Sequence, residues 1–519
     1  MTMHWLRRIS QISIFCVFVF LFLNTEYKDS DILPYAVNIF LRLDPLVAAA
    51  VSVASRALIP LLWPALITIF LTLIFGRFFC GWVCPLGALF DFTQLLIGKR
   101  HFSGTLPKRL ITLKYLLLAA LAGSMLFTLQ LVYLFDPLSI LIRSLAVAVF
   151  PAMNLMANSL FGVLYETDIP AVTSVSEPIY SFLKQHFLAF EQPHFQTAIV
   201  TGSIFFAILA LEYLERRFWC RYICPLGAVF GLLARFGLIR RGVVEPDCTS
   251  CTLCGANCRM GAIGDRSVAT AHAECIVCLD CEALCPEQAI SFRPGDKNQA
   301  LSPDLSRRGL LWSFGLGLAA APIFGSEAIA KTGNPARIRP PGALAEDDFL
   351  ARCTRCGECM RVCIANGLQP ALFESGLSGL WSPVLVSRIG YCEYNCTLCG
   401  QVCPTGAIKR LELPEKQKVK IGLAEVNRSR CLPWKGDSEC IVCEEHCPTP
   451  QKAIRLREEK VFSVNSTEPL ILKRPYVDEK LCIGCGICET KCPLSDRSAI
   501  IVTSRGETRA GEIGGGQGY

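Results

Sequence analysis

The chain has 519 residues, of which 52% are hydrophobic and 18% are charged, and its mean hydropathy is +0.41. This balance excludes a disordered chain and favours a membrane protein. The net charge of +7 is modest, and no basic stripe interleaved with aromatic residues indicates a nucleic-acid partner. The 29 cysteines are too many to be incidental thiols, so their spacing must decide the class of protein.

Five apolar runs predict membrane-spanning helices, because about 20 apolar residues are needed to cross ~30 Å of hydrocarbon. The runs are residues 9–23, 57–75, 115–135, about 195–211, and 309–325. Basic residues gather before the first run and in the loops that follow the second and fourth runs, whereas the alternate loops are acidic. This alternation predicts an inner-membrane protein with a cytoplasmic N-terminus and four spans before the fifth run.

A sixth apolar run, residues 145–164, contains Pro151, Asn154 and Asn158. If this run crossed the membrane, the basic loop at 216–241 would lie outside, against the charge rule. We therefore expect a helix that lies on or partly in the outer leaflet.

The fifth apolar run has the features of a twin-arginine export signal in the interior of the chain. It opens with Ser306-Arg307-Arg308 and closes with Ala328-Ile329-Ala330. The alternative is a plain fifth span with arginines on the inner side. Both interpretations place the residues after Lys331 in the periplasm, and cleavage after Ala330 stays open.

Eight cysteines between the fourth and fifth runs form two quartets with the spacing C-x2-C-x2-C-x3-C. They are Cys248, Cys251, Cys254 and Cys258, followed by Cys275, Cys278, Cys281 and Cys285. This spacing is typical of bacterial ferredoxins, in which three thiolates on a tight loop bind one [4Fe–4S] cluster and the fourth binds the neighbouring cluster. We therefore expect two clusters that exchange Cys258 and Cys285; structural zinc or strained disulfides fit the spacing less well.

Sixteen more cysteines form four quartets after the fifth run. They are Cys353, Cys356, Cys359 and Cys363; Cys392, Cys396, Cys399 and Cys403; Cys431, Cys440, Cys443 and Cys447; and Cys482, Cys485, Cys488 and Cys492. The outer two quartets have the regular spacing, and the inner two have extra residues in the first gap. This symmetry favours a nested pairing, outer with outer and inner with inner, and pairing of sequence neighbours is the alternative. Either pairing predicts four more [4Fe–4S] clusters, and eight disulfides would not explain the C-x2-C units.

A C-x3-C-P-L-G-A motif occurs twice, each time after a run that is expected to end on the inner face. Its cysteines are Cys80, Cys84, Cys220 and Cys224. We expect these four thiols to meet at one redox or metal centre, with Arg77 and Arg221 lowering their pKa values. The alternatives are dithiol–disulfide cycling and a purely structural turn. Cys16, in the first run, is expected to be a small apolar residue.

Several cofactor signals are missing from the sequence. None of the six histidines lies in the cores of the first four runs, and no C-x-x-C-H motif, phosphate-binding loop or dinucleotide fingerprint occurs. We therefore expect no haem and no NAD.

The duplicated turns, the four runs and the two-cluster ferredoxin of residues 1–300 resemble the NapH family, membrane polyferredoxins associated with quinol oxidation for periplasmic nitrate reductase. Residues 302–519, with the Ser-Arg-Arg signal and four quartets, resemble the NapG/MauM ferredoxins. The chain therefore looks like a NapH–NapG fusion. It differs from the related NosR proteins, which carry an N-terminal flavin domain, so no flavin is expected; it differs from the CcoG assembly proteins in its second, exported ferredoxin.

The expected fold is an α-helical membrane domain with α+β ferredoxin-type domains. We expect a membrane domain at 1–241, a cytoplasmic two-cluster ferredoxin at 242–300, the signal or fifth span at 301–331, and a periplasmic four-cluster ferredoxin at 332–519.

The resemblance implies electron transfer from the membrane quinone pool to a periplasmic terminal reductase or c-type cytochrome, through two cytoplasmic and four periplasmic clusters. The alternative is a redox maturation or regulatory protein for a periplasmic metalloenzyme. Whether the chain is itself the quinol-oxidising component stays open. Electrons could cross by diffusing quinone, a second subunit or the turn cysteines. No residue identifies the quinol site, because His186 and His194, near the outer face, are expected to be ordinary loop histidines.

Overall fold

The computed structural model describes residues 2–27, 31–33, 35, 37–98, 107–127, 129–189, 191–264, 268–294, 305–324, 334–372, 374–436, 438–461 and 470–510. The chain divides into two compact units, each built from separate stretches of sequence. Unit 1 comprises Met1–Asn24, Ala36–Ser144 and Val200–Phe324, and unit 2 comprises Thr25–Tyr35, Leu145–Ile199 and Gly325–Tyr519. The linear boundaries expected from the motifs stay predictions.

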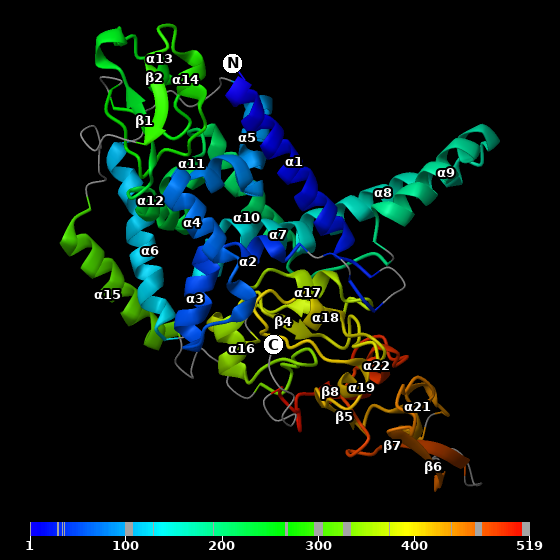
Figure 1. Cartoon of the computed structure of the whole chain (residues 1–519). Helices are drawn as coiled ribbons and strands as arrows, with labels where there is room; N and C mark the ends of the chain where they lie inside the picture. The colour runs from blue at the N-terminus through cyan, green and yellow to red at the C-terminus, as the bar shows by residue number, and fades with distance from the viewer. Residues whose placement is uncertain are drawn as a thin grey trace. The chain divides into compact units, whose positions relative to one another are not determined.

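Unit 1 is mainly helical, and prolines begin several of its helices (Figure 1). Pro85 and Pro225 are the first residues of α5 and α12, where a missing N–H costs no helical hydrogen bond. Asp44 caps α3 by accepting the N–H of Leu46 at 2.7 Å. The elements up to α12 are α1 (Thr2–Asn24), α2 (Ile39–Arg42), α3 (Pro45–Ser55), η1 (Pro60–Leu62), α4 (Ala65–Phe75), η2 (Phe79–Val83), α5 (Pro85–Ile97), η3 (Lys108–Ile111), α6 (Thr112–Met125), η4 (Leu131–Leu134), α7 (Pro137–Ser144), α10 (Ala198–Ala210), η6 (Leu211–Tyr213), α11 (Phe218–Tyr222) and α12 (Pro225–Ala234).

The rest of unit 1 is a small α+β region and one long helix. Strands β1 (Ile239–Val243) and β2 (Ile290–Pro294) pair antiparallel, with Val243 opposite Ile290. Between them lie η7 (Glu245–Asp247), α13 (Leu253–Ala256) and α14 (Asp280–Leu284). The long helix, α15 (Arg307–Phe324), packs along α6 at glycine: a Cβ on Gly317 would lie 1.8 Å from the carbonyl oxygen of Ala120. Small residues therefore let these two helices approach closely.

Two helices in the described part of the chain are long and apolar enough to cross a membrane, Trp5–Asn24 and Pro137–Glu166. A core helix of a soluble protein meets the same length and composition test, and 61% of the second window is buried. The runs expected at 57–75, 115–135 and 195–211 give α4, α6 and α10, with 11, 14 and 13 residues. At 1.5 Å per residue such helices are shorter than ~30 Å of hydrocarbon, so the structure does not show a four-span domain.

The run at 145–164 forms part of a longer helical stretch, and its expected position at the outer leaflet stays a prediction. It continues α7 through a π-helical turn, η5 (Leu145–Val149), into α8 (Phe150–Glu166). Pro151 lies in the first turn of α8, and the preceding π-helical turn accommodates it. Asn154 bonds within the protein, donating to Phe150 O at 2.9 Å and accepting from Ala189 N at 2.7 Å.

Unit 2 contains a helical hairpin and a region of short helices and two-stranded sheets (Figure 1). Helix α8 packs against α9 (Pro170–His186), where the tilted rings of Phe161 and Tyr180 have their centroids 5.0 Å apart. The antiparallel sheets are β3 (Leu368–Pro370) with β4 (Pro383–Leu385), β5 (Leu423–Val426) with β8 (Ile500–Thr503), and β6 (Ile454–Val461) with β7 (Leu470–Val477). The other elements are α16 (Glu346–Arg352), α17 (Glu358–Arg361), η8 (Leu377–Gly379), α18 (Leu398–Gln401), α19 (Leu413–Lys416), α20 (Leu432–Lys435), α21 (Val442–Glu445) and α22 (Ile487–Thr490).

Candidate iron–sulfur centres

The four regular quartets share one backbone conformation. The second and fourth residues after the first cysteine have positive φ in every one, including Val277 at 50°. The eight positions are Ser250, Thr252, Val277, Leu279, Arg355, Gly357, Gly484 and Gly486. A β-branched residue avoids this region unless its surroundings impose it, so the loops are held in one ligand-wrapping shape.

In unit 1, one cavity is lined by three cysteines of the second quartet and by the fourth cysteine of the first, Cys258. The three are Cys275, Cys278 and Cys281. The Cys258 sulfur accepts the N–H of Ala262 at 3.3 Å. Cys254 and Cys285 belong to the hydrophobic cluster next to this cavity. Cys258 thus lies with the second quartet, as the predicted exchange requires, and the reciprocal grouping of Cys285 with Cys248, Cys251 and Cys254 stays a prediction.

In unit 2, the first two C-terminal quartets lie together. One cavity is lined by Cys363, Cys392, Cys396 and Cys399, which are the fourth cysteine of one quartet and the first three of the next. Cys403, the fourth cysteine of the next quartet, lies near Cys353 and Cys359. Because of this proximity, a Cys403 thiolate would raise the pKa of both thiols.

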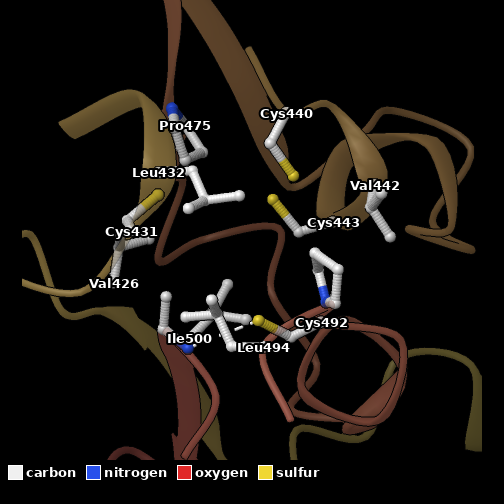
Figure 2. Close-up of a pocket in the computed structure, with 12 residues that line it drawn as sticks. Val426, Cys431, Leu432, Cys440, Val442, Cys443, Pro475, Cys492, Leu494 and Ile500 are labelled. Carbon is white, nitrogen blue, oxygen red and sulfur yellow. Dashed lines mark hydrogen bonds between the residues drawn. The ribbon is translucent and has the colours of Figure 1, made fainter. Parts of the chain in front are cut away.

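The last two quartets exchange cysteines in the same way. Cys492 lines a cavity with Cys431, Cys440 and Cys443, and Figure 2 shows the sulfur-bearing side chains around it. The companion cavity is lined by Cys447, Cys482, Cys485 and Cys488.

The nested pairing is therefore wrong, and sequence neighbours pair. The pairing of β5 with β8 explains the second pair, because it continues into a hydrogen bond from Asn427 N to Ala499 O at 2.7 Å. That contact brings the loop of Cys431 beside the loop that follows Cys492. The N–H of Ala499 also donates to the Cys492 sulfur at 3.3 Å.

The donor set fits [4Fe–4S] clusters. Burial raises the pKa of Cys275 to about 11 and that of Cys281 to about 12, so these thiols would keep their protons unless a cation displaced them. In the described part of the chain, no three His, Cys, Asp or Glu side chains are close enough to hold a single metal ion. Four thiols around a cavity suit a larger cofactor, and the N–H···S bonds are a known means of tuning cluster potential.

The centres in unit 2 follow one another. Cys399 lies near Cys359, and Cys392 N donates to Cys485 O at 2.8 Å. Cys488 in turn lies near Cys443. The four cysteine sets thus form a series that begins at Cys353 and ends at Cys431.

The two C-x3-C-P turns meet in unit 1, as the repeat predicts. Cys80, Cys84 and Cys224 are buried and Cys220 is half-buried, and a Cys80 thiolate would be close enough to raise the pKa of each of the other three thiols. Cys80 lies in the π-helical turn η2.

The prediction of a lowered pKa is wrong in direction for Cys84, Cys220 and Cys224. Burial raises the pKa of Cys220 to about 12 and raises those of Cys84 and Cys224, and the nearby arginines offset this only in part. Arg221, which was expected to lower the pKa of the turn cysteines, forms an ion pair with Glu215.

Arg217 is the functional residue that the sequence analysis missed. It stands three residues before Cys220, as Arg77 stands before Cys80, so the repeat itself carried the signal. Arg217 reaches across to the first turn, donating to Cys80 O at 2.9 Å and to Gly87 O at 3.1 Å. Arg77 reaches the second turn, where a Cβ on Gly227 would lie 2.9 Å from its guanidinium. The two repeats therefore brace each other with exchanged arginines.

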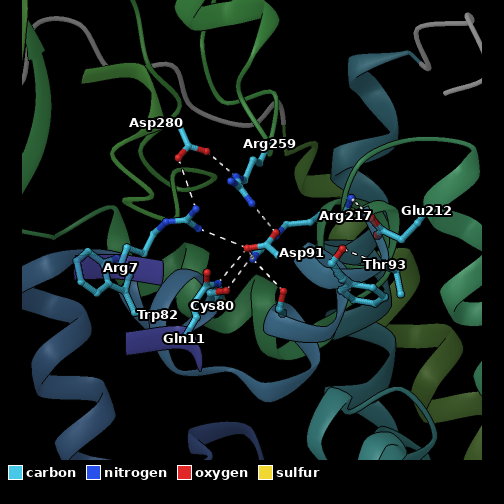
Figure 3. A network of polar contacts seen from close by, with 12 residues as sticks. Arg7, Gln11, Cys80, Trp82, Asp91, Thr93, Glu212, Arg217, Arg259 and Asp280 are labelled. Carbon is cyan, nitrogen blue, oxygen red and sulfur yellow. Dashed lines mark hydrogen bonds and ion pairs between the residues drawn. The ribbon is translucent and has the colours of Figure 1, made fainter. Parts of the chain in front are cut away.

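A buried ionic network anchors the first turn to the cluster loops of unit 1 (Figure 3). Asp91 accepts from Arg217 at 2.9 Å, Arg259 at 2.7 Å and Gln11 at 3.0 Å, and Arg7 lies 3.4 Å away. These cations hold the pKa of Asp91 well below its usual range despite burial.

The turns also touch the cluster loop directly. Trp82 Nε1 donates to Val277 O at 2.9 Å, and a Cβ on Gly81 would lie 2.4 Å from Ile276 O. Glu274 accepts from Arg77 at 2.8 Å. The two C-x3-C-P turns therefore pack directly against the loop that carries Cys275, Cys278 and Cys281.

Comparison with protein families gives two matches. A family model described as a 4Fe-4S binding domain matches residues 57–103 and 197–243, and a second model with the same description matches residues 475–494. The first model covers both C-x3-C-P turns.

Comparison with curated proteins finds similar ferredoxin-type proteins. The methylamine utilization ferredoxin-type protein MauM of Methylorubrum extorquens is 37% identical over 40% of this chain and 89% of its own length. The ferredoxin-type protein NapG of Escherichia coli is 35% identical over 34% of this chain and 76% of its own. MauM of Paracoccus denitrificans is 35% identical over 38% of this chain and 88% of its own length. No solved structure matches the chain.

Proposed function

Because the chain belongs to the NapG/MauM family of ferredoxin-type iron–sulfur proteins, we propose that it carries electrons from membrane quinol to a periplasmic redox partner. The observation that carries this proposal is the series of four cysteine-lined centres in unit 2. A series of one-electron centres in contact is the arrangement that conducts electrons between two surfaces. No phosphate loop or dinucleotide fingerprint occurs in the sequence to favour other chemistry.

Six quartets hold six [4Fe–4S] clusters, two in unit 1 and four in unit 2. When bound, each cluster supplies one-electron transfer. The protein supplies the cysteine ligands, the N–H donors to sulfur and an apolar surround that excludes water. These features set the potential at which each centre accepts an electron.

The membrane arrangement follows the charge pattern of the sequence, with the N-terminus in the cytoplasm and residues after 334 in the periplasm. Exposed apolar side chains support it, including Leu66, Phe70, Ile199 and Phe206 on the short helices α4 and α10. The close packing of α15 on α6 at Gly317 supports retention of α15 as a membrane helix after export.

The turn cysteines hold one further iron–sulfur centre, shared by the two repeats. The match of both turns to a model described as a 4Fe-4S binding domain supports this, as does the meeting of two cysteines from each turn. Its contact with the Cys275–Cys281 loop makes it the neighbour of the unit 1 clusters.

The turn centre is tested by replacing Cys84 and Cys224 with Ser in anaerobically purified protein. Seven clusters give about 28 iron atoms per chain, and the variant is expected to contain about 24. Unchanged iron would leave the turn cysteines as dithiols or structural residues. Replacing Cys16, the exposed cysteine of α1, with Ser is the matched control and should leave iron unchanged.

The function is tested in liposomes that contain the purified chain and reduced quinone. We expect quinol to reduce the unit 2 clusters, measured by electron paramagnetic resonance, at a rate that supports turnover of an added periplasmic reductase or c-type cytochrome. Clusters that dithionite reduces but quinol does not would overturn the proposal and leave a maturation or regulatory role.

A further inference from the structure

A cavity in unit 2 lies between the root of the α8–α9 hairpin and α17, and the cysteine spacing does not account for it. The empty space between its lining residues, together with the open solvent at its mouth, is about 520 Å³. Part of its wall is apolar, with Ala146, Phe150 and Phe195 buried. Its polar groups include Glu191 and Arg361.

We propose that this cavity binds the ring of a membrane quinol, beside the clusters that would accept its electrons. The inference rests on the proposed function and deepens it by locating the electron donor. A quinol ring is flat and apolar with two hydroxyl groups at opposite ends, so it suits a mainly apolar cavity with a few polar groups.

The first argument is the position of the cavity beside two centres. Cys363 lines it and also lines the cavity of Cys392, Cys396 and Cys399. Helix α17 carries Cys359, of the adjacent centre, and ends at Arg361 in the cavity wall. A ring bound here would therefore contact Cys363, an expected ligand of one cluster. It would also lie next to α17, the helix that carries Cys359, an expected ligand of a second cluster.

The second argument is access from lipid. Ala146 belongs to η5 and Phe150 begins α8, so the cavity lies at the root of the hairpin. The hairpin exposes large apolar side chains on both helices, namely Met153, Leu155, Met156, Leu160, Val163, Val175, Ile179 and Phe182. A surface of this kind on a membrane protein faces lipid, where a quinol tail would lie.

The third argument is how rigidly the polar groups are held. Arg361 lies over the Phe150 ring at 4.0 Å, donates to Thr25 O at 2.9 Å and pairs with Glu26 at 3.7 Å. This places a cationic hydrogen-bond donor at the wall for a ring oxygen. Glu191 is exposed at the mouth, where its carboxylate can take a proton and pass it to water.

The chemistry balances with these parts. Oxidation of one quinol breaks two O–H bonds and gives a quinone, two protons and two electrons. The two electrons would go one each to the two clusters that the cysteine sets of Cys363 and Cys359 would hold in their oxidised state. One proton passes to Glu191 and the other to water at the mouth.

The site is tested by labelling the full chain, in detergent, with a short-tailed photoreactive quinone and mapping the adduct by mass spectrometry. We expect adducts within residues 146–150, 189–195 or 361–366. Ala189→Phe, which fills the cavity, should lower labelling at least about tenfold. Ala171→Phe, at an exposed position on α9, is the matched control and should label as the parent protein does. Labelling elsewhere, or labelling that Ala189→Phe leaves unchanged, would overturn the proposal.

A second variant, Glu191→Gln, tests the site without changing the size of a side chain that lines the cavity. Glu191→Gln should retain quinone labelling but slow quinol-driven cluster reduction, on the order of 100-fold for loss of a proton acceptor. Glu177→Gln, on the same hairpin, should have no effect. Iron content and dithionite reduction show that each variant is intact. If quinol fails to reduce even the parent protein, the proposed function fails; if it reduces Glu191→Gln and Ala189→Phe as fast as their controls, the function stands and this site is wrong.

Discussion

At the scale of single residues, the fourth cysteine of a quartet lines a cavity with three cysteines of the neighbouring quartet. Cys492 lies with Cys431, Cys440 and Cys443, although it is separated from Cys431 by more than fifty residues of sequence. Exchange of this kind makes each pair of centres a single folding unit.

Replacing Cys492 with Ser tests the pairing. We expect loss of the cluster of the Cys431 loop, so that Cys431, Cys440 and Cys443 become reactive to alkylation while Cys482 stays protected. Mass spectrometry of the alkylated chain measures this. Alkylation of Cys482 would mean that the quartet keeps its own fourth cysteine, and alkylation of Cys353 would restore the nested pairing.

Glycine is required at one position of the last quartet. Gly484 has φ of 74°, and a Cβ there would lie 2.4 Å from backbone atoms of Gly422. Gly484→Ala should therefore lower iron by about four atoms and destabilise the fold by more than the ~1–2 kcal/mol that positive φ alone costs. Iron analysis and thermal unfolding measure the two effects.

The control for that substitution is Gly506→Ala. Gly506 has φ of 67°, but a Cβ there would meet only the end of the flexible Lys420 side chain, at 3.3 Å. The Gly506→Ala variant should lose only the stability that a positive φ costs an alanine, and it should keep the iron content of the parent protein. Equal losses in both variants would remove the steric argument at Gly484.

Helices of unit 1 are joined by buried charged side chains. Asp91 on α5 links Arg7 of α1 to Arg217, which precedes α11, and to Arg259 beside the cluster loops. Such a network is costly to break because the remaining cations stay buried.

Asp91→Asn should therefore destabilise unit 1 by about 3–5 kcal/mol and loosen the 242–294 region. Limited proteolysis of the full chain in detergent should show faster cleavage in that region. Asp247→Asn, at an exposed aspartate of the same region, is the matched control. Equal cleavage rates in both variants would mean that the network does not anchor the cluster loops.

The sequence predicted these elements unevenly, for physical reasons. Local spacing determines a C-x2-C loop, which all six quartets contain, so the quartets were found by inspection. The partner of each quartet depends on strand pairing such as β5 with β8, which spacing does not encode, and the nested prediction failed there. Apolar runs overestimated helix length because Pro60 and Pro64 lie inside the run at 57–75, and α4 begins only after Pro64.

At the scale of the whole chain, we expect the segment at Arg307 and Arg308 to determine how the C-terminal residues reach the periplasm. Changing both arginines to Lys keeps the positive charge, so a plain span would still insert. An export signal that requires twin arginine would not function. We expect the variant to leave residues after 334 inaccessible to protease added from the periplasmic side.

The control is Arg293→Lys, which makes the same kind of substitution at an exposed position of β2, outside the Arg307–Arg308 segment. The C-terminal residues of this variant should be exported normally. If the Arg307 and Arg308 double variant is cleaved from the periplasmic side as fast as this control, the segment is an ordinary fifth span.

The discontinuity of unit 2 has a consequence for biogenesis. Asp31 holds Thr397 through two hydrogen bonds of 2.7 Å, and Arg361 lies over Phe150 at 4.0 Å, so early segments pack against a region that the ribosome makes hundreds of residues later. Those segments must wait, with Phe150 and Phe195 uncovered, until the cluster-bearing portion arrives. We therefore expect nascent chains arrested before residue 334 to be more exposed to chaperones and proteolysis than the full chain.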